Sequence, residues 1–191
     1  MQEKDRYLRK VSFLIFLIFI FFAKNTLLAR NIESELNDYN KTLKNSSVLF
    51  IQSDGETVEE GIINIGKERI KIIYKNPKEI SIVITEKKSM YVSHELKEAQ
   101  FFNTNKSLVG IFFKILSGNN FFKNSDIEIK NENIYVKKIF KIDEALFKLN
   151  VIYEDQPIKL RKVIVKNNDY SFEIGFFDHK NFVINKKGYF S

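Results

Sequence analysis

Short apolar runs separated by polar turns fill most of this chain, a pattern that is typical of antiparallel strands joined by tight connections. The stretch 46–77 shows it most clearly. Three strand-length runs are divided there by Ser53-Asp54-Gly55 and by Gly66-Lys67-Glu68, and Pro77 ends the third. Apolar residues alternate in the second and third runs, so one face of the sheet can be buried while the other stays in water.

The runs predict two groups of strands. The first group is 48–52, 58–65, 69–74, 80–85, 89–93 and 98–102, and the second is 126–130, 134–140, 147–153, 158–166, 171–177 and 182–185. About eleven or twelve short strands at this spacing indicate a meandering sheet, a sandwich or a barrel. No internal repeat or linker divides the chain, and 191 residues correspond to one domain.

Two segments have helical rather than alternating spacing. The segment 31–44 is predicted to be an amphipathic helix packed on the sheet. Its apolar face consists of Ile32, Leu36, Tyr39 and Leu43. The second segment begins after Ser107, is almost wholly apolar, and stops at 117–120. Its apolar positions suit a fixed plug over the open end of the sheet and a movable lid over an apolar cavity equally well.

Residues 1–29 have the pattern of an export signal. A basic start is followed by about a dozen apolar residues at 11–23, which is short for a membrane-spanning helix of roughly 20 residues. Ala29 supplies a small residue before a cut at Ala29–Arg30. We therefore expect a cleaved signal peptide, with an uncleaved anchor as the alternative. Either form would place the domain at 30–191 outside the cytoplasm.

Charge and composition narrow the function. The chain carries 31 Lys+Arg against 24 Asp+Glu, but the lysines are scattered in the way solvated strand faces require, and no dense basic block indicates nucleic-acid binding. The lack of cysteine excludes disulfides, thiol catalysis, cysteine-ligated metals and lipidation of an N-terminal Cys.

Candidate catalytic chemistry is sparse. His94 and His179 stand in turn-like settings without a second His or Cys at metal-ligand spacing, which predicts ordinary surface residues. The chain has neither a Gly-x-Ser-x-Gly elbow nor a Gly-rich phosphate loop. We therefore predict no enzyme, no metal site and no cofactor, since catalysis would need a site scattered over strands.

A series of motifs in the first half of the chain carries a family resemblance. An exported start and an amphipathic helix are followed by Phe50-Ile51-Gln52, then by the Gly-initiated strand 61–65. A basic strand ends in Tyr74-Lys75-Asn76-Pro77, and an apolar strand, a charged turn and Met90-Tyr91 come next. This order resembles the LolA family of periplasmic outer-membrane lipoprotein carriers. The resemblance extends over about residues 36–118. Beyond that range only the overall architecture is similar.

The resemblance implies a mainly β fold: an incomplete antiparallel β-barrel of about eleven strands with a helical lid and an N-terminal amphipathic helix. It implies a monomer that takes lipoproteins from an inner-membrane lipoprotein-releasing ABC transporter and delivers them to an outer-membrane acceptor. Apolar residues would shield the acyl chains, because each exposed CH₂ costs about 0.8 kcal/mol. The lack of cysteine distinguishes the chain from the acceptor, which has the same fold and is lipidated on an N-terminal Cys.

Two alternatives remain open. One is another periplasmic lipid-binding or envelope-stress-sensing protein of the same fold. The other is a membrane-tethered interaction module, which would require the signal to remain uncut.

The resemblance also implies residues for the site. The candidate lipid-lining residues of the strands are Ile63, Ile65, Ile70, Ile72, Tyr74, Ile82, Ile84, Tyr91 and Phe101. The inner face of the lid would consist of Ile111, Phe112 and Ile115. All of these residues suit an ordinary hydrophobic core equally well.

One position departs from the family pattern. The family often has an Arg after the second strand that holds the lid shut by bonding to lid backbone. Here the corresponding place reads Gly66-Lys67-Glu68-Arg69, one residue short and without the usual Pro. Lys67 and Arg69 are therefore the latch candidates, although Lys offers a point charge where Arg offers a planar fork.

Overall fold

A computed structural model describes residues 30–117 and 121–181. The compact unit that begins at Ile32 contains every strand within these two ranges. The predicted signal segment at 1–29 and the predicted strand at 182–185 lie outside the described residues.

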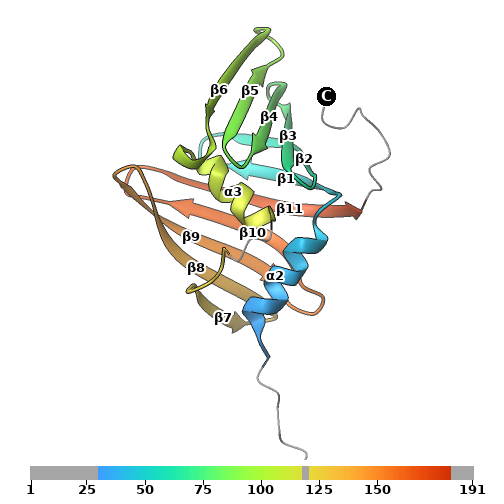
Figure 1. Ribbon diagram of the computed structural model, residues 1–191, viewed down its shortest axis with the longest axis vertical. Coiled ribbons are helices and arrows are strands. Elements are labelled where there is room, and N and C mark those ends of the chain that lie inside the picture. The colour runs from blue at the N-terminus through green and yellow to red at the C-terminus, as the bar shows by residue number, and fades with distance from the viewer. Residues whose placement is uncertain (1–29, 118–120, 182–191) are drawn as a thin grey trace, which may run out of the picture. The chain divides into compact units, whose positions relative to one another are not determined.

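Eleven strands form one antiparallel sheet, as the sequence predicts. They are β1 (Ser46–Ser53), β2 (Val58–Ile65), β3 (Arg69–Asn76), β4 (Ile80–Thr85), β5 (Lys88–Ser93), β6 (Glu98–Asn103), β7 (Asp126–Lys130), β8 (Asn133–Ile142), β9 (Ala145–Glu154), β10 (Lys159–Lys166) and β11 (Ser171–Asn181). Their order is β6-β5-β4-β3-β2-β1-β11-β10-β9-β8-β7. The first and last strands thus pair at the centre, and β6 and β7 form the two open edges (Figure 1).

Two α-helices lie on one face of this sheet, which we call the inner face (Figure 1). They are α2 (Ile32–Thr42) and α3 (Leu108–Ser117), and a short 3₁₀ turn, η1 (Thr104–Lys106), precedes α3. α3 packs against α2 and β4 on its way from one edge of the sheet to the other. The unclosed sheet and its covering helix match the predicted incomplete barrel with a helical lid. No helix in the described part of the chain is long and apolar enough to span a membrane.

The pairing of β1, β2 and β3 explains a glycine within the sheet. Gly61 lies opposite Phe50 on one side and Tyr74 on the other, and the two rings meet edge to face at 5.1 Å. A Cβ on Gly61 would lie 2.0 Å from the carbonyl oxygen of Ile73 and 2.8 Å from the Phe50 ring. Only glycine lets the strand and the ring approach this closely.

The predicted apolar face packs on the core as expected, although α2 ends at Thr42 and Leu43 follows it. Leu36 and Leu43 are buried, while Ile32 and Tyr39 pack partly exposed against the core. Two polar neighbours are buried as well: Asn37 and Asn40. Hydrogen bonding accounts for one of them, because the Asn40 side-chain oxygen accepts from the hydroxyl of buried Tyr153 at 3.3 Å.

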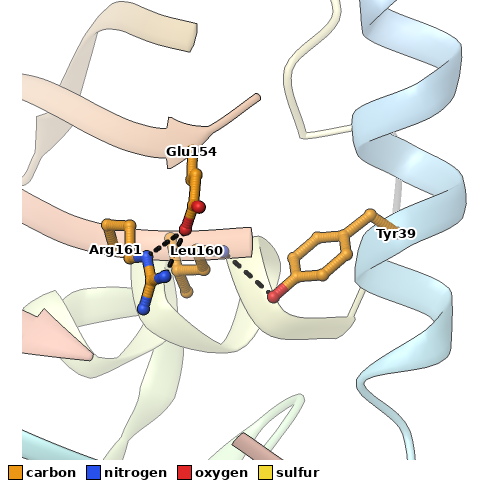
Figure 2. Close-up of polar contacts among 4 residues, drawn as sticks. All are labelled: Tyr39, Glu154, Leu160 and Arg161. Atoms are coloured by element: carbon orange, nitrogen blue, oxygen red, sulfur yellow. Dashed lines mark hydrogen bonds and ion pairs between the residues drawn. The ribbon is translucent and has the colours of Figure 1, made fainter. Parts of the chain in front are cut away.

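α2 is joined to the sheet where β10 bulges. Arg161 is the extra residue of β10 between the pairs that Leu160 and Lys162 make with β9. The Leu160 N–H donates to the Tyr39 hydroxyl at 3.0 Å, and the Arg161 Nε donates to Glu154 at 2.7 Å (Figure 2). Burial raises the pKa of Tyr39, although the Leu160 bond and the Arg161 charge oppose this. Tyr39 therefore remains a neutral hydroxyl that fixes α2 to the strand.

The last strand corrects one prediction. Residues 178–181 were expected to form a turn, but β11 continues to Asn181. Asp178 has a φ of 50°, and the pairing with β1 shifts register there, so a bulge rather than a turn accommodates the polar residues. His179 consequently lies within a strand, and its Nε2 is buried, contrary to the expected surface position. His94 is exposed, as expected, and its Nε2 lies 2.8 Å from the Ser81 hydroxyl.

Candidate functional site

The strand register brings most of the predicted lining residues onto the inner face. Ile63 pairs with Ile72, Ile65 with Ile70, and the row continues across β4 and β5. The inner-face residues confirmed by this pairing are Ile63, Ile65, Ile70, Ile72, Tyr74, Ile82, Ile84 and Tyr91. The five isoleucines at 63, 65, 70, 72 and 84 are buried, while the other three are partly exposed. Whether any of them binds lipid stays a prediction.

Phe101 was expected to face inward, and this expectation is wrong. It pairs with Met90, on the face opposite to Tyr91, and is 62% exposed. The Lys88 ammonium lies 4.0 Å from the centre of its ring. Its neighbour Phe102 faces inward instead, opposite Ser89. Two adjacent phenylalanines leave the strand register undecided in the sequence, and a shift of one residue exchanges the faces.

The other half of the sheet, which the prediction did not include in the site, supplies an equally apolar inner face. Paired rows across β11, β10, β9 and β8 carry it. Its buried residues are Phe172, Ile174, Phe176, Leu160, Val163, Val165, Leu149, Val151, Tyr153, Ile134 and Val136. Their alternation is visible in the sequence, so the same reasoning applied after residue 125 would have found them.

The predicted lid residues all face the sheet. Ile111, Phe112 and Ile115 are buried, and the Phe112 ring lies 5.8 Å from that of Phe172 on β11. Beyond the helix, Phe122 is fully buried with its ring 6.0 Å from that of Tyr153. These side chains pack on the inner face and cover part of it.

The beginning of α3 is packed tightly onto the sheet edge. The Thr104 hydroxyl lies 2.7 Å from that of Ser89, and both residues are buried. A Cβ on Gly110 would lie 2.3 Å from the Thr104 carbonyl oxygen. This contact requires glycine and leaves little freedom at the first turn of the helix.

The segment after α3 is held by a different kind of contact. The Lys138 ammonium donates to the carbonyl oxygens of Phe121 and Lys123, at 2.5 and 3.0 Å, and lies 4.9 Å from the Phe121 ring centre. Desolvation is the main reason that the pKa of Lys138 is lowered. The charge of Lys114 adds to this lowering, and that of Glu33 opposes it. A single partly buried cation from β8 thus fastens residues 121–123.

The sequence contained a signal for Lys138 that the prediction missed. It occupies an inward position of β8, between Val136 and Phe140, where an apolar residue is expected. The predicted latch residues are both exposed: Lys67 lies in the turn between β2 and β3, and Arg69 is the first residue of β3. The Gly66 N–H closes this turn by donating to the Arg69 carbonyl at 2.9 Å. The role of Lys67 and Arg69 in holding the lid stays a prediction.

The polar groups on the inner face include neutral hydroxyls and amides. The Tyr74 hydroxyl donates to Gln52 at 3.1 Å, and burial raises its pKa, with the charge of Glu59 adding to the effect. Burial likewise raises the pKa of Tyr153. The Asn37 side-chain oxygen is buried without a partner among the described residues. An interior of this composition can shield hydrocarbon and offers it few hydrogen bonds.

Comparison with known proteins supports the fold. No protein-family model matches the chain, and no curated protein matches it. An uncharacterized conserved protein from Thermus thermophilus has a similar structure, with a TM-score of 0.54 and 9% sequence identity over 81% of this chain and 90% of that one. At this identity the likeness concerns the fold alone.

Two further structures are similar at lower scores. MucB in complex with MucA(peri) matches with a TM-score of 0.45 and 7% identity, over 83% of this chain and 57% of that one. LprF from Mycobacterium bovis matches with a TM-score of 0.41 and 10% identity, over 80% of this chain and 92% of that one.

Proposed function

We propose that this protein is a periplasmic carrier that shields the acyl chains of lipoproteins and has no catalytic activity. One observation carries the proposal: an apolar inner face runs across both halves of an unclosed sheet, and the almost wholly apolar helix α3 covers it. If α3 moves away, the apolar surface of the sheet that it covered can be covered instead by a bound acyl chain.

The route of the cargo is the finer part of the proposal. The resemblance to the LolA family suggests that lipoproteins arrive from an inner-membrane ABC transporter and leave to an outer-membrane acceptor. Such a carrier must release its cargo, so the covering helix has to open at moderate cost. The lid's two attachments fit this need, because a tight packing contact fixes the start of α3 and a polar contact holds the residues that follow it.

Copurification tests the proposal. The protein is isolated from cells with a tag, and bound lipoproteins are identified by mass spectrometry. We expect a lipoprotein in its acylated form, and we expect a version of the same lipoprotein without acyl chains to bind at least about tenfold more weakly, since several buried CH₂ groups are lost. Equal binding of the two forms would exclude an acyl-chain carrier. Binding of free lipids without any lipoprotein would point to a different lipid-binding role.

A further inference from the structure

The outer face of the sheet, opposite to the helices, carries a groove that the proposed function does not use. Two adjoining recesses of about 760 and 660 Å³ share Ile139, Lys148 and Lys166. We call them together the lysine groove. Leu149 and Val165 face inward and pair with each other, so the neighbouring pair Lys148 and Lys166 faces outward.

The charges of the larger recess are unbalanced. Its outward-facing charged residues are Lys137, Lys148 and Lys166 and a single carboxylate, Asp126. The smaller recess adds two acidic residues, Asp169 and Glu144, and the Glu144 carboxylate binds Lys141 at 2.9 Å. Asp126 pairs across the strands with Lys137, whose ammonium also binds Glu128 at 3.0 Å. Lys148 and Lys166 lie directly opposite each other on β9 and β10, and neither forms an ion pair within residues 30–117 and 121–181. Like charges placed opposite each other destabilise a sheet, so this pair favours an anion between them.

Apolar and amide groups accompany these lysines. Ile139, opposite Lys148 on β8, is 67% exposed, and Leu146 in the smaller recess is 64% exposed. The Asn150 side-chain oxygen is buried and has no partner among the described residues. Exposed apolar side chains beside unsatisfied polar groups are typical of a binding surface rather than of a solvated sheet face.

The groove also reaches the lid's attachment. Asn124, which follows α3, lines the larger recess, and so does Lys138, whose ammonium binds the carbonyls of Phe121 and Lys123. An occupant of the groove would lie beside Asn124 and on the face of β8 opposite to the Lys138 ammonium.

We propose that the lysine groove binds an acidic, partly apolar segment of a partner protein. A carboxylate of the segment accepts hydrogen bonds from Lys148 and Lys166, and an apolar side chain packs on Ile139. Exposed apolar side chains beside the lysines suit a segment that carries both acidic and apolar residues. The proposed binding site is inferred from the groove alone. Its connection with cargo transfer rests on the proposed function.

Fluorescence anisotropy tests this assignment. The probe is a short fluorescein-labelled peptide of alternating Glu and Leu, and the protein is the purified chain. In the double variant Lys148→Gln/Lys166→Gln we expect the peptide to bind about tenfold more weakly, because both exposed charge contacts are lost. The matched control, Lys75→Gln/Lys130→Gln, removes the same charge from exposed strand positions outside the groove and should bind the peptide as the parent protein does.

Three outcomes would overturn the proposal. They are a lack of peptide binding to the parent protein, equal weakening in both double variants, and binding of anionic phospholipid vesicles, instead of peptide, that depends on Lys148 and Lys166. A fluorescent fatty acid, added separately, reports on the inner face. Its binding should be the same in the groove variant and the parent, so a failure of the carrier proposal can be distinguished from a failure of the groove assignment.

Discussion

Lys137 and Lys138 are neighbours in sequence and act on opposite faces of β8. Lys137 points outward to Glu128 in an exposed pair, whereas Lys138 points inward and binds two carbonyls after α3. The alternation of a strand is enough to separate a surface charge from a structural one. A cation in the inward position loses solvation and is retained only when it finds acceptors.

Replacing Lys138 by Met keeps the apolar stem and leaves the carbonyls of Phe121 and Lys123 without their donor. Hydrogen bonds to a charged group are worth about 1.5–3 kcal/mol, so amide hydrogen exchange in α3 and in residues 121–124 should be at least about tenfold faster. Mass spectrometry of the exchanged peptides measures this. The control Lys137→Met should leave these peptides unchanged, and equal exchange in the two variants would exclude Lys138 as the fastening.

At the scale of elements, α3 shows how one helix can belong both to a core and to a site. Its side chains Ile111, Phe112 and Ile115 are packed as core residues are. Its attachments differ at the two ends, with close packing at Gly110 and a polar contact after the helix. The end held by the polar contact is the one from which we expect opening to begin.

Replacing Phe112 by Glu tests the role of α3. A carboxylate in this apolar position must be desolvated when the helix covers the sheet, so we expect binding of a fluorescent fatty acid to weaken by at least about tenfold. The strands form most of the core and should keep their circular dichroism spectrum. Lys114→Glu places the same charge on the exposed side of α3 and is the control. If fatty acid binding survives in Phe112→Glu, this residue does not line the binding space.

The positions of the strands were easier to predict from the sequence than the face of the sheet on which a residue lies or the residues that it contacts. The strands at 58–65 and 80–85 are found at the predicted residues, because alternation and turn residues mark them locally. Phe101 was assigned to the wrong face because neighbouring apolar residues make the register ambiguous. The inward position of Lys138 could have been read from the alternation of β8, but its contact with Phe121 and that of Asn40 with Tyr153 join residues that are distant in sequence. Long-range pairing decides such contacts, and a single sequence does not display it.

At the scale of the whole molecule, the half-buried His179 connects stability with pH. Burial is the main reason that the pKa of His179 is lowered, and the nearby charges of Arg161 and Lys159 add to it while Asp178 opposes it. The unfolded chain therefore binds more protons than the folded one around the ordinary histidine pKa of about 6.5. The free energy of unfolding should fall as the pH drops through that range and level off below the lowered pKa.

Urea denaturation at a series of pH values measures this dependence. In His179→Gln the decrease around pH 6.5 should be smaller than in the parent protein, since the proton uptake on unfolding is removed. An unchanged slope in the variant would assign the pH dependence to other groups.

The central claim is that acyl chains occupy the space between α3 and the inner face of the sheet. Photo-crosslinking in cells tests it most directly, with p-benzoylphenylalanine placed either at Phe112, which is 4% exposed, or at Phe101, which is 62% exposed on the outer face. We predict a crosslinked adduct with the acyl chain of a lipoprotein at Phe112 and none at Phe101. Adducts of equal yield at both positions, or an adduct at Phe101 alone, would contradict the account.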